Sequence, residues 1–320
     1  MHNLRRFYYN NKDKIWKVVL ITAFLLGMIY LLDSTAIDRI NEKTKNKEIE
    51  SDEIYTNIDM QTYIEKESAI SGSTITKTEV EKINKTISEF LQYCKNGNIQ
   101  EAYDMLSTDC KENHYKTLDE FDERYVKKKY SKDNVFKIQK WINNMYKVSI
   151  TTDMLSSGVV NANEKIEYIT IIEEGTEKKL NVNEYVGQIN INKQMSQNNM
   201  EVTVIKKQMY KDYEIYEFKI KNLSDKTIML DSLQKIGTMY LEDLNNIKYN
   251  AYGHEIFEQS LIIKPKEETN ISIKYANPYT TRVNIKQIVF ENIISDYITY
   301  KKEENKKQYE GINEIIIKLK

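Results

Sequence analysis

The sequence predicts an α+β fold with an N-terminal transmembrane helix, a domain of helices followed by an antiparallel sheet, and an all-β sandwich. Three observations predict it: an uncharged apolar run near the start, apolar residues at steps of three and four after residue 78, and alternation with period two thereafter. A chain of 320 residues suits two domains with connecting parts. The predicted segments are a tail (1–14), a transmembrane helix (15–33), a polar stalk (34–77), the α+β domain (78–197) and the sandwich (198–320).

The first element is the apolar run. It is uncharged from Val18 to Leu32, and it extends to Ile15 if the Lys17 ammonium reaches the lipid headgroups. The eighteen residues from 15 to 32 span roughly 27 Å, close to the ~30 Å hydrocarbon core of a bilayer. Aromatic rings sit near both ends, where the membrane interface favours them. The predicted anchor residues are Trp16, Lys17, Val18, Leu25, Tyr30 and Leu32.

Flanking charges predict the orientation of this segment. Five lysines and arginines precede it against only Asp13, whereas Asp33 and Asp38 follow it. The positive-inside rule then places the N-terminus in the cytoplasm and residues 33–320 outside a cell membrane. The small residues Ser34–Ala36 also fit a cleaved signal peptide, so retention and cleavage both stay open.

Composition and cysteine usage narrow the class of protein. Two prolines and many lysines, asparagines and isoleucines are typical of an AT-rich bacterial genome. A formal net charge of -1 gives no field that attracts nucleic acid, so no nucleic-acid partner is predicted. Cys94 and Cys110 fit either one disulfide in an oxidising compartment or two small buried side chains.

Helices come next along the chain. The first shows one apolar face, begins at a capping box of Thr78 and Glu81, and ends at Gly97. A second capping box at Asn98 and a third at Thr117 predict two more short amphipathic helices. The apolar face of the first helix comprises Val80, Ile83, Ile87, Phe90, Leu91 and Cys94.

Strands follow the helices. Residues 135–141 and 145–151 alternate around an Asn-Asn turn, and residues 165–172 and 178–182 flank the turn "EEGT". We expect the helices to cover one face of this sheet. From about residue 200 to the end, short alternating runs separated by turn residues predict a β-sandwich whose last strand is "INEIIIKLK".

Two stretches resemble known families. "FLQYCKNGNIQEAYDMLS" (residues 90–107) resembles the first helices of the nuclear transport factor 2-like superfamily, whose cone-shaped fold is shared with ketosteroid isomerase. The resemblance covers about 80–195 and implies a cone interior, for which the candidate residues are Tyr103, Leu106, Tyr125 and Trp141. "LIIKPKEETNISIKY" (261–275) resembles a signature of bacterial immunoglobulin-like domains, without the Cys-Trp-Cys pattern of antibody domains.

Motifs for catalysis are weak. The three histidines, His2, His114 and His254, lack metal-site spacing, and His114 is expected in a loop. Ser232 and Lys235 match the SxxK of penicillin-binding enzymes without its partner motifs, so we interpret the match as chance. A ketosteroid-isomerase-like site needs a carboxylate and a tyrosine aimed into the cone, but Asp104 should point away from the Tyr103 face. We therefore predict no enzyme activity, no metal and no cofactor.

These observations predict a binding or scaffold protein of the cell envelope. The layout resembles the single-pass assembly factors of type IV secretion and Gram-positive conjugation machines, which implies membrane lipid and other envelope proteins as partners. A ligand-sensing module that uses the cone as a pocket is the alternative, and an extracellular enzyme is a third reading. A filled cone interior favours the scaffold, an open apolar cavity favours the ligand binder, and an ionised pair inside a cavity favours the enzyme. The oligomeric state stays open.

Overall fold

The computed structural model describes residues 62–65, 77–152, 164–281, 283–303, 309 and 311–319. The chain divides into two compact units, Met1–Asp59 and Met60–Lys320, and every described residue lies in the second. Among the described residues, no helix combines the length and the apolar character that a membrane crossing requires. The predicted anchor residues, from Trp16 to Leu32, lie outside the described residues, as does the predicted stalk up to residue 61.

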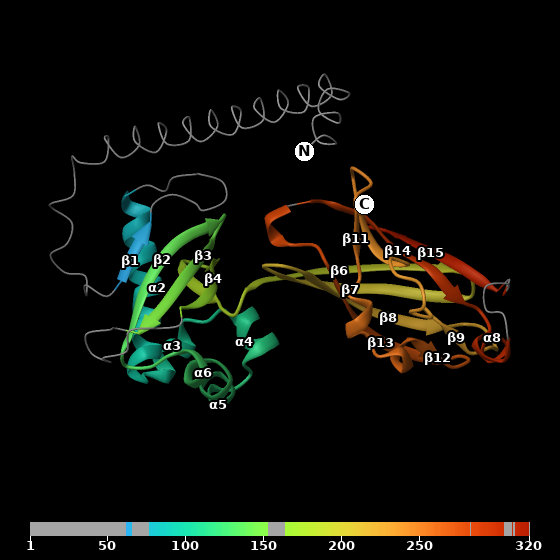
Figure 1. Ribbon diagram of the computed structural model, residues 1–320, viewed down its shortest axis with the longest axis horizontal. Coiled ribbons are helices and arrows are strands. Elements are labelled where there is room, and N and C mark those ends of the chain that lie inside the picture. Colours follow the sequence, from blue (N-terminus) through green and yellow to red (C-terminus); the bar gives the residue numbers. More distant parts are fainter. Residues whose placement is uncertain are drawn as a thin grey trace, which may run out of the picture. The chain divides into compact units, whose positions relative to one another are not determined.

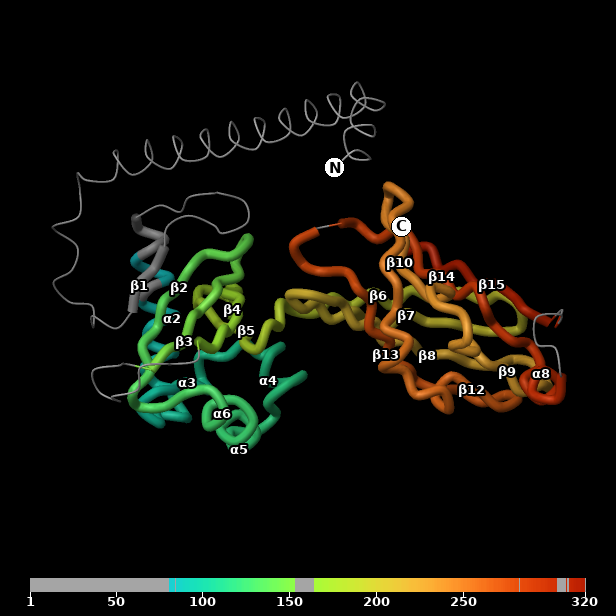
Figure 2. The backbone as a smooth tube through the Cα atoms, viewed as in Figure 1, coloured from blue at the N-terminus to red at the C-terminus, as the bar shows by residue number. Residues whose placement is uncertain are grey.

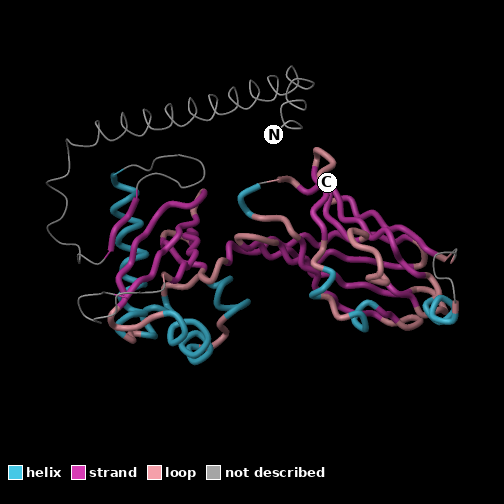
Figure 3. Tube along the Cα trace, viewed as in Figure 1, coloured by secondary structure: helices cyan, strands magenta, loops and turns pink. Residues whose placement is uncertain are grey.

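The fold is β-rich, and the predicted class of α+β with a transmembrane helix is wrong. Strands make up 47% of the described residues and helices 25%. Strands predominate in the part of the chain that is coloured in Figure 3. The physical reason is that the helices after the first one are short, with three to seven residues each. In contrast, paired strands are the main elements of the described residues after 164, and the helices among them have three to six residues.

The N-terminal lobe, residues 62–181, combines a five-stranded sheet with helices that share its core (Figure 1). The strand order is β1-β2-β3-β4-β5, with β1 parallel to β2 and the other pairs antiparallel. The strands are β1 (Thr62–Glu65), β2 (Asn134–Ile142), β3 (Met145–Thr152), β4 (Lys165–Glu174) and β5 (Glu177–Asn181). The helices are α2 (Lys77–Asn96), α3 (Ile99–Asp104), α4 (Thr108–His114), α5 (Leu118–Phe121), the π-helix η1 (Asp122–Val126) and α6 (Lys127–Lys129).

Local signals predicted much of this lobe. Gly97 ends α2 with a φ of 78°, and the Thr117 side chain accepts a hydrogen bond from the Glu120 N–H at 3.2 Å, which confirms both predictions. The predicted capping box at Asn98 is wrong, because this side chain makes no capping bond, although α3 begins one residue later. Helix α4 was not predicted, and the Ser107 side chain caps it by accepting from the Cys110 N–H at 2.8 Å.

The C-terminal lobe, residues 185–318, consists of two sheets around one core (Figure 2). One sheet has the order β13-β8-β7-β6; the other has the order β11-β10-β14-β9-β12, with β15 paired to β14. The strands are β6 (Tyr185–Gln197), β7 (Met200–Tyr210), β8 (Glu214–Asn222), β9 (Ile228–Met229), β10 (Met239–Asp243), β11 (Lys248–Asn250), β12 (Ile262–Ile263), β13 (Glu268–Tyr275), β14 (Ile285–Ile294) and β15 (Ile312–Lys318). Short helices accompany them: η2 (Gly253–Glu255), η3 (Glu258–Leu261), η4 (Tyr279–Thr281) and α8 (Tyr297–Lys302).

The β6–β7 hairpin belongs to both lobes. Its open end carries Tyr185 and Tyr210, which are buried in the N-terminal core, whereas Met200 and Val202 near its turn are buried in the C-terminal core. Residue 198, where the sequence placed a domain boundary, lies in the turn of this hairpin. The junction between the lobes is therefore the stretch in which β5 ends and β6 begins.

Candidate functional site

The junction segment, Asn181–Gln188, leads from β5 into β6 and has an unusual backbone. Asn183 and Glu184 both adopt left-handed conformations, with φ of 60° and 66°. Asparagine tolerates this region, but for glutamate it costs roughly 1 kcal/mol or more. The surrounding contacts must therefore hold the segment in place, and two groups of polar side chains do so.

The first group is a buried ion pair that we call the Glu167 clamp. The Glu167 side chain on β4 is 1% exposed and pairs with the Lys129 ammonium on α6. Its other oxygen accepts a hydrogen bond from the Asn183 N–H at 2.5 Å, and Lys129 also donates to the Asn183 side-chain oxygen at 2.9 Å. Burial raises the pKa of Glu167 above its usual range, and the ion pair and the N–H bond only partly offset this effect.

The second group centres on Asp109 of α4. One carboxylate oxygen accepts from the Tyr185 hydroxyl at 2.8 Å and from the Gln188 N–H at 3.0 Å. The other accepts from the Asn113 side-chain amide at 2.8 Å. Both oxygens are thus engaged, and the bonds from Tyr185 and Gln188 come from the junction segment.

Ser107, which caps α4, extends the same network. Its hydroxyl donates to the Asn181 side-chain oxygen, while the Asn181 amide donates to the Val186 carbonyl at 2.8 Å. Ser107 and Asn181 are both fully buried, so these bonds replace hydration that the two side chains lose. The start of α4 is therefore fixed to both ends of the turn between β5 and β6.

His114 is the last residue of α4, which corrects its predicted place in a loop. Its imidazole lies edge-on against Tyr185, with 4.4 Å between ring centroids, and its Nε2 lies 3.4 Å from the Tyr210 hydroxyl. Burial lowers the pKa of His114 and raises the pKa values of both tyrosines above their usual range. The three rings are therefore neutral near pH 7.

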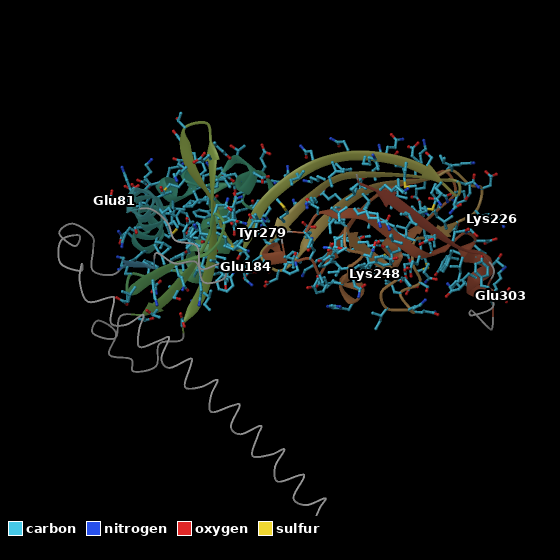
Figure 4. All side chains as sticks on the ribbon, turned by 90° about the horizontal axis from the view of Figure 1, so that it is seen from above. Glu81, Glu184, Lys226, Lys248, Tyr279 and Glu303 are labelled. Carbon is cyan, nitrogen blue, oxygen red and sulfur yellow. The ribbon has the colours of Figure 1, made fainter. Side chains whose placement is uncertain are left out.

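A third contact reaches the N-terminal lobe from the loop before β14. The Tyr279 hydroxyl, labelled in Figure 4, donates to the Asn144 side-chain oxygen and accepts from the Asn143 amide, each at 3.3 Å. Its backbone N–H donates to the Lys211 carbonyl at 2.9 Å. Asn143 and Asn144 form the turn between β2 and β3, so this contact is independent of the junction segment.

The predicted interior residues lie in three places. Leu106 and Tyr125 are buried in the N-terminal core, and Tyr103 lies at its edge, where its hydroxyl donates to the Tyr115 carbonyl at 2.8 Å. Trp141 lies outside this core and packs on Tyr168, with 5.4 Å between centroids. Alternation along β2 directs Phe136 and Ile138 inward, but the register with β3 shifts between Lys140 and Ile142, so Trp141 joins Ile142 in a separate cluster.

Aromatic rings fill the centre of the N-terminal core. Tyr125 lies 5.3 Å from Phe121, 5.8 Å from Tyr115 and 6.3 Å from Phe90, measured between centroids. Its hydroxyl lies 2.9 Å from that of Tyr130. The two cysteines are free and buried in the same core, and burial raises the pKa of Cys110 to about 12. The alternative of two buried thiols therefore describes this structure.

The other motifs noted in the sequence are not joined, among the described residues, by neighbouring groups that would form a catalytic site. Ser232 and Lys235 lie in the loop before β10, where the Ser232 hydroxyl accepts from the Asn292 amide at 2.8 Å and no helix brings the lysine alongside. Asp104 accepts from the Gln100 side chain at the surface. Within the described ranges, no three histidine, cysteine or acidic side chains are grouped as a metal site would require. An open depression of about 230 Å³ lies on the outside of α4 and the residues after it, lined by Lys111, Glu112 and Lys116.

Sequence reasoning missed the residues that build the junction. Glu167 carried a detectable signal, because alternation in β4 places it on the same face as Ile169 and Ile171, and an inward glutamate needs a partner. Asp109 carried none, since its partners Tyr185 and Gln188 lie 76 and 79 residues away.

Comparisons with known proteins do not show a family. No family model matches the chain, and no curated protein matches it. Among solved structures, the crystal structure of the yjhA protein from Bacillus subtilis matches with 12% sequence identity, covering 40% of this chain and 97% of that chain. The TM-score of this match is 0.28, which is too low to support an argument about fold or function.

Proposed function

We propose that this protein is a membrane-anchored extracytoplasmic binding or scaffold protein of the bacterial cell envelope. The observation that carries the proposal is the packed aromatic centre of the N-terminal core, with Tyr125 fully buried among Phe90, Phe121 and Tyr115. A ligand-sensing module or an enzyme would need space at this place for a small molecule. A scaffold instead needs packed lobes and an outer surface for partners.

The state of the polar groups supports the same proposal. Both oxygens of Glu167 and both of Asp109 accept hydrogen bonds from the protein itself. A general base must reach a substrate proton, so carboxylates engaged in this way favour a structural role over proton transfer. The ion pair of Glu167 with Lys129, which in an open cavity would favour an enzyme, here holds a turn.

The contacts between the lobes support the scaffold part of the proposal. The Asp109 network and the Tyr279 contact join the lobes at two separate places. A scaffold that presents two surfaces to its partners benefits from such double attachment, because a single flexible linker would leave the surfaces free to reorient.

The proposed localisation rests on the sequence. The apolar run Val18–Leu32 and the basic residues before it support insertion with residues 33–320 outside. The resemblances to the nuclear transport factor 2-like superfamily and to bacterial immunoglobulin-like domains are part of the proposal. Together they support a role as an assembly component of a conjugation or secretion apparatus, with membrane lipid and other envelope proteins as partners.

Cell fractionation and protease treatment of intact cells test the proposed localisation. We expect the full-length chain to sediment with membranes and an external protease to remove the part after residue 33 while the cells stay sealed. Crosslinking of the exposed part should then give adducts with other envelope proteins. Full-length chain that stays soluble without detergent and unprocessed, or a chain protected until the cells are lysed, would contradict the proposal.

A further inference from the structure

Strand β6 has an edge with no strand partner among the described strands, although groups near its start, at Val186 and Gln188, bond to Asn181 and Asp109. It is the terminal strand of its sheet, it has 13 residues, and β7 is its strand partner among the described strands. Typical strands have about five or six residues. The unpaired N–H and C=O groups of an edge strand form a template for another strand, so proteins usually cover or shorten such edges.

Other edge strands of the C-terminal lobe are short or are contacted at one point. On β15, the Glu314 carbonyl accepts from the side chains of Gln197 and Asn198 at 3.3 and 3.0 Å. The end of β13 is bridged at Tyr275 by Ala251. The edge strand β11 has only three residues and begins with a lysine. The edge of β6 is thus longer than those of β11, β13 and β15, although the eight-residue edge of β13 is bridged only at its last residue.

A bulge separates the last five residues of β6 from its first part, whose register with β7 also shifts between Tyr185 and Gly187. The register with β7 shifts between Asn190 and Lys193, and Asn192 has a φ of 51°. After the bulge, Lys193–Gln197 pairs without interruption with Val204–Met200. Gln194 and Ser196 are exposed, whereas Met195 packs against the core. This second half is therefore continuously paired with β7 on one side and has no strand partner on the other among the described strands.

The chemistry of this half is self-complementary. It reads Lys-Gln-Met-Ser-Gln, with one charge and no acidic residue. Amide and hydroxyl side chains both donate and accept, so they can bond to their own kind. Antiparallel pairing with an identical strand centred on Met195 sets Gln194 opposite Ser196 and Lys193 opposite Gln197. Centring on Lys193 would instead bring two ammonium groups face to face.

We propose that β6 is the interface for a second copy of this chain, paired antiparallel through Lys193–Gln197 about a two-fold axis at Met195. The four-stranded sheets of the two copies then form one continuous sheet. An isologous contact of this kind closes on itself, which satisfies both edges without starting a fibre. This inference goes beyond the proposed function, because it names one partner and the surface that binds it.

Adding positive charge to the outer edge of β6 tests the proposed pairing of two copies. The double variant Gln194→Lys with Ser196→Lys adds like charges at facing positions of the two-fold pair, while both side chains remain exposed in one copy. We expect the dissociation constant of the full-length dimer in detergent micelles, measured by sedimentation equilibrium, to rise about 10- to 100-fold. The matched variant Gln194→Thr with Ser196→Thr should remain dimeric, because threonine suits a strand and carries no charge.

Disulfide trapping separates this contact from association through other parts of the chain. Met195→Cys places one thiol at the two-fold centre, where facing Cβ atoms lie within bonding reach. Ile189→Cys, at a side chain 47% exposed beyond the bulge, is the control. Mild oxidation should yield a covalent dimer for the first variant only. A monomeric wild type, equal crosslinking of both variants, a Lys pair without effect, or a Met195→Cys adduct with a different protein would each overturn the proposal.

Discussion

Buried polar side chains serve different purposes in the two lobes. In the N-terminal lobe, buried and half-buried polar side chains join distant parts of the chain: Ser107 bonds a residue 74 positions away, Asp109 one 76 positions away and Lys129 one 38 positions away. In the C-terminal lobe most of them close local loops. Buried Asp231 accepts from the Leu233 N–H at 2.7 Å and from the Thr238 hydroxyl at 2.6 Å.

Asp243 follows the local pattern, and Asn222 departs from it. Asp243 accepts from the N–H groups of Asn245 and Ile247 at 2.8 and 2.9 Å, which closes the β10–β11 turn. Asn222 donates to the Lys226 carbonyl but also to that of Ile263, 41 residues away. Polar residues thus stabilise loops in the C-terminal lobe, whereas in the N-terminal lobe they hold β6 against α4. Removing a polar side chain of this kind from the N-terminal lobe should therefore perturb more distant residues than removing one from the C-terminal lobe.

The largest expected effect comes from breaking the Glu167 clamp. Lys129→Ala leaves a buried carboxylate without its cation, and such losses cost about 3 to 5 kcal/mol. We expect a decrease of this size in the free energy of unfolding, measured by urea denaturation of the full-length chain in detergent. Lys128→Ala, at an exposed neighbour, is the control and should change it by less than about 0.5 kcal/mol. Similar values for the two variants would show that the clamp contributes nothing.

A smaller effect should appear in the pH dependence of stability. Because burial raises the pKa of Glu167 above its reference value of 4.5, the folded state binds its proton more tightly than the unfolded state. The contribution of this group to stability is then fully present below pH 4.5 and is lost as pH rises through the raised folded-state pKa. The stability of wild type minus that of Glu167→Gln should fall across this window. If this difference in stability instead rose with pH, the predicted direction of the pKa shift of Glu167 would be contradicted.

The smallest effect should come from the Tyr279 contact. Tyr279→Phe keeps the ring and removes a hydroxyl whose two hydrogen bonds are long, at 3.3 Å. We expect a loss of about 0.5 to 1 kcal/mol in the free energy of unfolding. Tyr252→Phe, in the same lobe, is a matched control for removing a hydroxyl. A loss above about 2 kcal/mol would identify this contact, and not the junction segment, as the main attachment between the lobes.

The sequence predicted what short-range signals determine. The α2 end at Gly97, the Thr117 cap and the hairpin turns at Asn143 and Gly175 depend on residues within four positions of each other. Strands β2 to β5 followed from alternation. Strand β6 did not, because "YVGQININKQMSQ" is rich in amides and its alternation is interrupted by the bulge.

The junction could not be predicted for a related reason. Its contacts join residues tens of positions apart, and polar residues carry no periodic signal that pairs them. Trp141 was a candidate for the cone interior, whereas the register shift at the end of β2 places it with Ile142 outside the N-terminal core. The fold class was wrong because helical periodicity in short stretches was given too much weight against the strands that follow.

Hydrogen exchange of the full-length chain in detergent tests the comparison most directly. Asp109→Ala removes a half-buried acceptor of the junction, and Asp231→Ala removes a buried acceptor of a loop. We predict faster exchange across β6 and β7, residues 185–210, in the first variant. In the second, we predict it around residues 231–238 and at Asn292, whose side chain also bonds to Asp231, and not along whole strands. An effect of Asp109→Ala confined to α4, or equal spread in both variants, would contradict the account.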